Sequence, residues 1–402
     1  MNLRYSTDIV IFGGGVAGLW LLKRLTQEGY QAILIEQNEL GTGQTLSSQG
    51  IIHGGLKYAL SGNLTNATRA IADMPARWRQ CLAGDDPMNL SQVKVLSEHY
   101  YMWSASSFRS KIKTFLGSKS LQGRVSSVPK DQLPEFFQHE AADGNLYQLP
   151  DFVIDTASLL DTLIKDLDAH IFQVDTNLID FVADESGNYS GININNDGTT
   201  IQIDCGRMVF SAGEGNNDLI ERCKLNKVDT QTRPLHMVYL KHHSLPEVFV
   251  HCIGDDFSMT PMLTVTSHRD IDGNTVWYLG GELAESGVNK SREEQIEEGR
   301  AQVAQYFSWV DFSDAQWDSF LINRAESKMP DGSRPDDAAL AEESNVIVAF
   351  PTKFTLTPNL ADRLIAHLNE SNVEKAGGLD VSGLNSQLRN ATLGRAKWET
   401  AH

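Results

Sequence analysis

The chain has 402 residues, which is long enough for two domains that each bury a core of their own. Hydrophobic residues at 41% and charged residues at 21% are ordinary for a soluble globular protein. The formal net charge of −18 disfavours nucleic acid, whose phosphates need a basic face, and disfavours attachment to anionic lipid. No apolar run approaches the ~18 residues of a membrane-spanning helix, so we expect a cytoplasmic protein with no transmembrane segment. The four cysteines form no C-x-x-C pair and no cluster with histidine, which indicates no metal site.

A strand, a tight turn and a helix are predicted at the N-terminus. Ile9 to Phe12 is a short apolar run of the buried-strand type, and apolar residues recur at helical spacing from Val16 to Leu25. Between them, Gly13, Gly15 and Gly18 form the pattern G-x-G-x-x-G. Glycines let the backbone approach a pyrophosphate, and a helix N-terminus offers N–H groups and the positive end of a dipole. The sequence therefore predicts a dinucleotide site in this turn.

A second strand supplies the other half of that site. The apolar run from Ala32 to Ile35 ends in Glu36, eighteen residues after Gly18. A carboxylate at this point can bind the hydroxyls of a ribose. The stretch from Asn38 to Gly50 is small, polar and rich in glycine and hydroxyl groups, so we expect a loop whose backbone amides lie against the ligand. These residues alone leave NAD and FAD as alternatives.

The middle of the chain alternates between helices and strands. Apolar residues at helical spacing predict a helix from Leu64 to about Leu82 and a second helix capped by Asp155 or Thr156. A buried strand is expected from Met208 to Gly213. Shorter strands are expected at residues 93–96, 99–103, 171–174, 178–182, 191–194 and 201–205.

Between residues 227 and 321 the pattern changes to strands joined by polar turns. Ser291 and Glu294 form a capping box that opens an amphipathic helix behind these strands. The strand-like runs, which we expect to pair as antiparallel neighbours, are 236–241, 248–252, 262–266 and 275–279.

The segment from Gly50 to Tyr58 resembles FAD-dependent oxidoreductases of the D-amino-acid oxidase type. Its part His53-Gly-Gly-Leu-Lys-Tyr58 is similar to FAD-linked glycerol-3-phosphate dehydrogenases, which have arginine where this chain has Lys57. Its part Gly50-Ile-Ile-His53 is similar to L-2-hydroxyglutarate oxidases. The resemblance implies FAD as the cofactor. It also implies a mixed α/β fold, in which a Rossmann-like FAD-binding domain of the glutathione-reductase type carries a substrate domain built on an antiparallel β-sheet.

The resemblance divides the chain into three parts. Residues 1–84, 151–222 and 322–376 are expected to form a discontinuous FAD-binding domain. Residues 85–150 and 223–321 are expected to form the substrate domain, and residues 377–402 a polar C-terminal tail.

A second cofactor segment is implied near the C-terminus. After a buried strand from Val346 to Phe350, Lys353-Phe-Thr355 matches a Lys-x-Thr segment that lies at the pyrimidine end of the flavin in the resembled family. Thr357 is predicted to cap the next helix, with Pro358 at its first position. The N–H groups and dipole of such a helix stabilise the negative charge of a reduced flavin. Two segments far apart in the sequence that serve one flavin favour FAD over NAD.

The expected FAD-binding residues come from the N-terminal segment and from the resemblance. The N-terminal segment gives Gly13, Gly15, Val16, Ala17, Gly18, Glu36, Gln37, Thr45, Ser48, Gln49, Gly50 and Ile52. The resemblance adds Leu178, Ala212, Gly213, Lys353, Phe354 and Thr355.

Five residues are candidates for catalysis. Hydride transfer to flavin N5 needs an anchor for the acidic group of the substrate and an acceptor for a proton. Arg324 stands where the resembled family places the arginine that binds a substrate carboxylate, and a structural salt bridge is its alternative role. His53 is an acid or base at the flavin, or else a residue that shapes its loop. Lys57 and Tyr58 can bind an anionic group, and His251 lies on the predicted substrate sheet, where a structural role is its alternative.

The leading hypothesis is an FAD-dependent oxidoreductase that oxidises a small anionic substrate, a 2-hydroxy acid or an amino acid. Its electrons would pass to O2, a quinone or a protein. One alternative is an FAD-linked dehydrogenase of a phosphorylated polyol such as glycerol 3-phosphate, which the segment from His53 to Tyr58 suggests. An alternative of another class is a flavin-binding or assembly protein without turnover.

Overall fold

The computed structural model describes residues 2–55, 66–105, 125–196, 198–254, 261–329, 335–371, 373, 375, 381 and 383–399. Two large β-sheets and one three-stranded sheet organise them. The two candidate residues Lys57 and Tyr58 lie outside the described residues. Among the described residues, no helix combines the length and the apolar character needed to cross a membrane.

The first sheet has nine strands and contains the predicted N-terminal unit. In spatial order its main path is β10 (Ile179–Ala183), β11 (Tyr189–Asn196), β12 (Thr199–Phe210), β1 (Asn2–Phe12), β2 (Ala32–Glu36), β9 (Ile171–Gln173) and β20 (Arg389–Asn390). Two further strands, β19 (Val346–Phe350) and β18 (Ala339–Glu343), extend it from β12. The pairs β12–β1, β1–β2, β2–β9 and β12–β19 are parallel, whereas β10–β11–β12 form the expected antiparallel ribbon.

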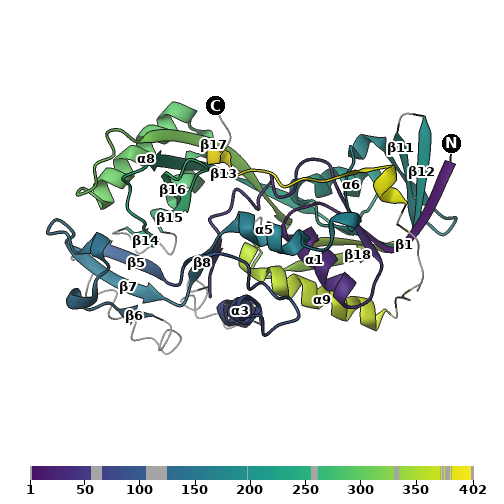
Figure 1. The fold of residues 1–402 in the computed structure, drawn as a ribbon, viewed down its shortest axis with the longest axis horizontal. Coiled ribbons are helices and arrows are strands. Elements are labelled where there is room, and N and C mark those ends of the chain that lie inside the picture. Colours follow the sequence, from purple (N-terminus) through teal and green to yellow (C-terminus); the bar gives the residue numbers. More distant parts are fainter. Residues whose placement is uncertain are drawn as a thin grey trace.

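Both faces of this sheet are covered, which explains why β1 is apolar at consecutive positions. Ile9 and Ile11 pack into a core with four helices on one face, and Val10 and Phe12 pack into the core on the other. The four helices, labelled in Figure 1, are α1 (Val16–Gln27), α3 (Asn66–Ala83), α5 (Thr156–Ile164) and α9 (Thr357–Glu370). The opposite core includes residues of α6 (Asn216–Arg222).

The second sheet has eight strands and lies beside the first (Figure 1). Its order is β17 (Gln316–Ser327), β13 (Thr230–His242), β16 (Thr275–Gly280), β15 (Leu263–Arg269), β14 (Val250–Ile253), β5 (Tyr100–Ala105), β7 (Gly144–Leu149) and β6 (Ser126–Ser127). All neighbours are antiparallel except β14 and β5, which confirms the expected antiparallel strands. The helix α8 (Arg292–Tyr306) packs on β13 and β17 and begins with the predicted capping box of Ser291 and Glu294.

A small sheet fixes the loop that follows the N-terminal unit. It consists of β3 (Ile51–Ile52), β8 (Phe152–Ile154) and β4 (Val95–Ser97), with β8 in the centre. β3 and β8 are antiparallel, so that Ile52 lies opposite Phe152. The residues just before β8 are thereby brought against the loop after β3.

The C-terminal segment spans both large sheets. Its strand β20 pairs with β9, and Leu393 forms a parallel bridge with Leu40 of the first half. The chain then crosses to the second sheet, where Trp398 is 4% exposed and packs against Tyr278 (Figure 1). The segment expected as a polar tail therefore supplies buried contacts to both sheets.

Two local predictions were wrong. The expected strands 201–205 and 208–213 are one strand, β12, because β1 pairs with it in continuous parallel register from Asn2 to Phe12. Thr357 does not cap α9: it is the first helical residue, and its hydroxyl donates to the carbonyl of Phe354. A 3-10 turn, Phe354–Leu356, precedes the helix and moves the N-cap to Leu356.

Candidate functional site

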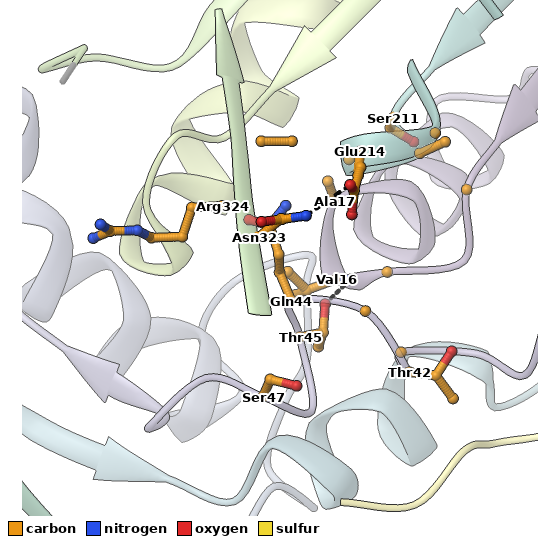
Figure 2. Close-up of a pocket in the computed structure, with 18 of the residues that line it drawn as sticks. Val16, Ala17, Thr42, Gln44, Thr45, Ser47, Ser211, Glu214, Asn323 and Arg324 are labelled. Atoms are coloured by element: carbon orange, nitrogen blue, oxygen red, sulfur yellow. Dashed lines mark hydrogen bonds between the residues drawn. The ribbon is translucent and has the colours of Figure 1, made fainter. Parts of the chain in front are cut away.

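A cavity of about 760 Å³ opens at the carboxyl ends of the parallel strands. It is lined by residues that follow or end β1, β2, β12 and β19, which is where open α/β sheets bind ligands. We call its lining residues from 12–17 and 35–49 the dinucleotide wall. The opposite side is formed by Leu235 and Met237 of β13 and by Ile322 to Ala325 of β17, which we call the sheet wall. Figure 2 shows the side chain of Asn323 on the sheet wall pointing toward Glu214, whereas the side chain of Arg324 extends to the other side of the strand.

Only glycine fits two positions of the predicted dinucleotide turn. Gly13 has φ +105°, and a Cβ there would lie 2.4 Å from the Cα of Ala212. A Cβ on Gly18 would lie 1.9 Å from the carbonyl oxygen of Gly13. The glycines thus allow the start of α1 to pack directly on the turn and on the end of β12, as a pyrophosphate-binding turn requires.

The N-terminus of α1 is turned to the cavity. Its N-cap is Gly15, which has no side chain to cap the helix, and the first turn carries no acidic residue. The N–H of Val16 donates to the hydroxyl of Thr45 at 2.9 Å, so the loop after β2 is tied to the helix start. Backbone N–H groups and the positive helix end therefore face a cavity that fits an anionic pyrophosphate.

Glu36 lines the cavity with both carboxylate oxygens engaged. Oε2 accepts the N–H of Gly14 at 2.5 Å, and Oε1 accepts the N–H of Asn38 at 2.8 Å. A carboxylate oxygen has more than one lone pair, so these bonds orient the group and leave it able to accept a ribose hydroxyl.

Ser48 gives an independent sign that a polar ligand belongs here. Its hydroxyl is buried, lines the cavity and has no hydrogen-bond partner among the described residues. Buried polar atoms are normally satisfied, so a hydroxyl left over in a cavity wall fits a bound polar group. Its neighbour Gln49 also lines the cavity and donates to the carbonyl of Tyr278 at 2.9 Å, which docks this loop on the second sheet.

The second cofactor segment meets the first one. Lys353 and Phe354 line the cavity, and Thr355 lies behind them, fully buried. The hydroxyl of Thr355 donates to the carbonyl of His53 at 3.2 Å. The ammonium of Lys353, itself 4% exposed, donates to the carbonyls of Pro335 and Asp336, both at 2.9 Å. Residues 53 and 355 are thus neighbours in space, as two segments that serve one cofactor would be.

The structure brings most of the expected FAD-binding residues to the cavity. Those that line it are Gly13, Gly15, Val16, Ala17, Glu36, Gln37, Thr45, Ser48, Gln49, Ala212, Gly213, Lys353 and Phe354. Five others lie outside its described lining and surround it: Gly18, Gly50, Ile52, Leu178 and Thr355. Gly50 has φ +67° and packs on the carbonyl of Ile154, whereas Leu178 is 39% exposed beside the lining residues Thr176 and Asn177.

Arg324 lines the cavity from β17 and is ion-paired. Its Nη1 lies 3.3 Å from a carboxylate oxygen of Glu285, and its Nε donates to the carbonyl of Arg233 at 3.3 Å. The side chain is 21% exposed. The salt bridge considered as its alternative role is therefore present, and binding of a substrate carboxylate stays a prediction.

His251 lies on β14 and outside the described cavity lining. Its Nδ1 is 3.0 Å from the hydroxyl of Thr264, and its ring packs against Tyr100 at 4.5 Å between centroids. Burial lowers the pKa of His251 to about 3, so the ring is neutral near pH 7. His53 is likewise outside the described lining, and its backbone holds the Thr355 segment.

Several lining residues carried no sequence signal. Asn323 donates to Glu214 at 2.8 Å across the cavity, joining β17 to the turn after β12 (Figure 2). Leu235 and Met237 face the cavity only because β13 runs alongside β17. No spacing rule predicts such a pairing. Among the described residues, no group of three His, Cys, Asp or Glu side chains could hold a metal ion.

Known proteins share this architecture. Residues 8–367 match the family model described as "DAO: FAD dependent oxidoreductase". A relative, the "Probable FAD-dependent oxidoreductase PA4991" of Pseudomonas aeruginosa, is 39% identical over 397 residues, 98% of each chain. Its crystal structure gives a TM-score of 0.83 with 36% identity and covers 99% of each chain.

Two more distant solved structures show the same fold. The L-alpha-glycerophosphate oxidase of Mycoplasma pneumoniae gives a TM-score of 0.64 at 14% identity, covering 90% of this chain and 95% of that one. The glycine oxidase of Geobacillus kaustophilus gives 0.62 at 16% identity, covering 94% and 97%. These comparisons confirm the expected mixed α/β fold with an FAD-binding and a substrate part.

Proposed function

The chain belongs to the DAO family of FAD-dependent oxidoreductases, and we propose that it oxidises a small 2-hydroxy acid or amino acid. FAD is its cofactor, and in this family's chemistry the flavin accepts a hydride at N5. The observation that carries the proposal is the position of Arg324: this residue of the second sheet is among those that line the same cavity as the dinucleotide turn. A planar guanidinium suits a substrate carboxylate, which it can hold by two parallel hydrogen bonds.

Different residues would bind different parts of the FAD. The N-terminus of α1 would hold the pyrophosphate and Glu36 a ribose, and the sheet wall and the segment Lys353–Thr355 would line the space left for the flavin. An acid held by Arg324 then lies at that end of the cavity. His53 stays the candidate acceptor for the hydroxyl or amine proton, because its backbone is fixed to Thr355 behind the cavity lining.

The alternative substrate is a phosphorylated polyol. The sequence likeness of residues 53–58 to glycerol-3-phosphate dehydrogenases favours it, and one structure with this fold is a glycerophosphate oxidase. At 14% identity that structure speaks for the fold alone.

A substrate panel tests the proposal. The purified holoprotein is mixed without oxygen with 2-hydroxy acids, amino acids and glycerol 3-phosphate, and the loss of the oxidised flavin band is recorded. We expect a 2-hydroxy acid or an amino acid to bleach the band. Bleaching by glycerol 3-phosphate and by none of the acids would establish the alternative, and bound FAD that no member of the panel reduces would favour a protein without turnover.

An arginine variant with a matched control tests the anchor. Arg324→Met should lower kcat/KM for the acid about 100-fold or more, because loss of one partner of a hydrogen-bonded charge pair costs about 2–5 kcal/mol. Arg269→Met makes the same change in a surface ion pair with Glu247, where both side chains are more than half exposed. That control should retain the kcat/KM of the wild type.

A further inference from the structure

The two arginines at the sheet wall stand directly opposite one another. Arg233 of β13 and Arg324 of β17 are cross-strand partners in the antiparallel register. Like charges at such positions repel, and each arginine has a carboxylate of its own. Arg233 pairs with Glu326, which is 1% exposed, and Arg324 pairs with Glu285. The four side chains together carry no net formal charge.

Glu285 is held on a fixed element. It belongs to α7 (Glu282–Ser286), a short helix that follows Gly281 at φ +84°. The N–H groups of the first two helical residues donate to the carbonyls of Pro261 and Met262, at 2.8 and 3.1 Å. Glu285 therefore reaches Arg324 from a helix anchored to the two residues that precede β15.

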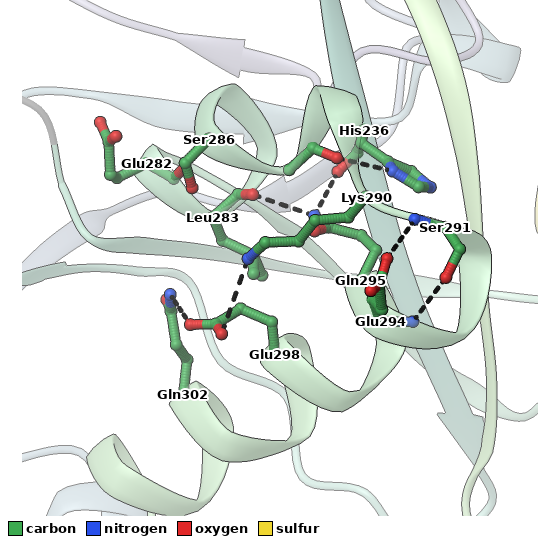
Figure 3. A network of polar contacts seen from close by, with 11 residues as sticks. His236, Glu282, Leu283, Ser286, Lys290, Ser291, Glu294, Gln295, Glu298 and Gln302 are labelled. Atoms are coloured by element: carbon green, nitrogen blue, oxygen red, sulfur yellow. Dashed lines mark hydrogen bonds and ion pairs between the residues drawn. The ribbon is translucent and has the colours of Figure 1, made fainter.

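A buried amide fixes the other side of α7 (Figure 3). Gln295 of α8 donates to the carbonyls of His236 and Leu283, at 2.8 and 2.9 Å. The Nδ1–H of His236 donates to the carbonyl of Gly287 at 3.0 Å. These bonds tie both ends of α7 to β13 and α8, so the carboxylate of Glu285 is placed by the fold.

The ion pair of Arg324 and Glu285 is open to replacement by a ligand, unlike the neighbouring pair of Arg233 and Glu326. Glu285 is 39% exposed and Arg324 21% exposed, whereas Glu326 is nearly inaccessible. Partly exposed ion pairs contribute about 0–1 kcal/mol, so an incoming carboxylate can replace Glu285 on the guanidinium. The incoming anion then lies beside the carboxylate that it displaced.

The charges of the cavity add to this effect. Its described lining contains two cations, Arg324 and Lys353, and the ammonium of Lys353 is turned to backbone carbonyls. The lining also contains four carboxylates, Glu36, Glu39, Glu214 and Asp218. Nothing in this set offers a surplus of positive charge to a substrate with two negative charges.

We propose that Glu285 is a specificity-determining residue that acts through Arg324 and selects against substrates by their net negative charge. This inference rests on the proposed role of Arg324 as the anchor of the acid group. Glu285 penalises a dianionic phosphate ester most, a simple carboxylate less and a zwitterion least, since the repulsion grows with the net charge of the ligand. It thereby sets the small acids apart from glycerol 3-phosphate.

Three ligands of different charge test the proposal on the holoprotein. Glycine, acetate and glycerol 3-phosphate carry about 0, −1 and −2 charges at pH 8, and their dissociation constants are measured from the perturbation of the flavin absorption band. Relative to wild type, Glu285→Gln should tighten acetate about fivefold and glycerol 3-phosphate about 25-fold, and should change glycine less than about twofold. The gains should shrink at high salt.

Two further variants distinguish a wrong role for Glu285 from a wrong role for Arg324. Glu282→Gln changes another carboxylate of α7 that has no ion pair among the described residues, and it should bind all three ligands like wild type. Arg324→Met should weaken acetate. If Arg324→Met weakens acetate and Glu285→Gln changes the three ligands equally or not at all, Glu285 has only a structural role and the inference fails alone. If Arg324→Met leaves acetate binding unchanged, or acetate binds to no variant, the anchor itself is wrong and both proposals fall.

Discussion

The two walls of the cavity are built in opposite ways. All residues of the dinucleotide wall come from the first 49 residues of the chain, and the bond from Val16 to Thr45 joins its two parts. The sheet wall exists only because β13 pairs with β17, which sets Leu235 opposite Ile322. The first wall therefore carries a recognisable sequence signature for the cofactor, whereas the second wall has no such signature. Substitutions in the two walls should therefore differ in how they change stability and the affinity for FAD.

The largest effect is expected where the C-terminal segment supports the sheet wall. Trp398→Ala removes a buried ring from the cluster with Tyr239, Tyr278 and Met237, and the free energy of unfolding should fall by about 3–5 kcal/mol. The hydroxyl of Tyr278 donates to the carbonyl of Ser47 at 2.8 Å, so FAD should also bind more weakly. Chemical denaturation and FAD titration measure the two effects.

A second tryptophan provides the control. Trp309 packs in a separate cluster of the second sheet, where its Nε1–H donates to the carbonyl of Phe136. Trp309→Ala should lower stability and leave the affinity for FAD unchanged. Equal losses of FAD affinity in both variants would show that the cavity responds to general destabilisation and not to the support of its sheet wall.

The contact between the residue before β8 and the loop after β3 should respond to pH. Asp151 is 3% exposed, and one of its oxygens accepts the N–H of Gly54 at 2.9 Å. Burial raises the pKa of Asp151 to about 7, and the bond from Gly54 opposes that shift. The folded protein therefore holds a proton that the unfolded chain releases near pH 4, and this contribution to stability is lost as pH rises from about 4 to about 7.

Asp151→Asn removes this titration and keeps an acceptor for the N–H of Gly54. The variant should gain about 1.5–2 kcal/mol over wild type as pH rises from 5.5 to 7, with little further gain up to pH 8, and the full effect from pH 4 upward is about 4 kcal/mol. Denaturation curves at each pH give the difference. A difference that does not change with pH would mean that Asp151 is ionised in the folded protein throughout.

The close approach of Gly13 to the backbone of Ala212 tests the role of the dinucleotide wall in FAD binding. Gly13→Ala introduces a Cβ within 2.4 Å of Ala212, and we expect FAD affinity to fall about 100-fold, roughly 3 kcal/mol, because the turn must move. Gly29→Ala is the matched control: its φ is +86° and no atom lies within 4 Å of the added Cβ. That variant should cost about 1–2 kcal/mol of stability through backbone strain and should retain FAD.

The smallest change in stability is expected from loss of the hydrogen bond between Val16 of α1 and Thr45 of the loop after β2. Thr45→Val keeps the shape of the side chain and removes the acceptor of the Val16 N–H, which should lower stability by about 1 kcal/mol. Thr45→Ser should restore it, because the hydroxyl returns. Thermal unfolding of the three proteins is the measurement, and a Val variant as stable as wild type would show that solvent or ligand replaces this bond.

Much of the fold follows from local pattern. The strand that ends at Phe12, the helix from Val16 and the strand that ends at Glu36 occur where predicted, because each is specified by its own apolar spacing. The first strand begins at Asn2 and not at Ile9, because β12 pairs with the residues in between. The capping box at Ser291 is equally local. Patterns with a range of a few residues are the ones that sequence reasoning reads well.

The errors occur where a remote partner overrides the local pattern. The predicted strands 201–205 and 208–213 left a break at residues 206–207, but ten residues of β1 and β12 pair across the whole stretch. The residues after 377 looked like a polar tail because their apolar contacts are few and spaced, and Leu393 and Trp398 find their partners at Leu40 and Tyr278. No spacing within either segment indicates those partners.

The sequence by itself determined the cofactor site, since a dinucleotide turn needs glycines and a carboxylate at fixed spacing within one short unit, Gly13 to Glu36. It also named Arg324, through a resemblance that left its role open. Only the tertiary structure placed that arginine on the cavity, opposite Arg233 and beside Glu285. The physical reason is that the charge around a side chain depends on neighbours brought in by strand pairing and helix docking, which local pattern does not encode.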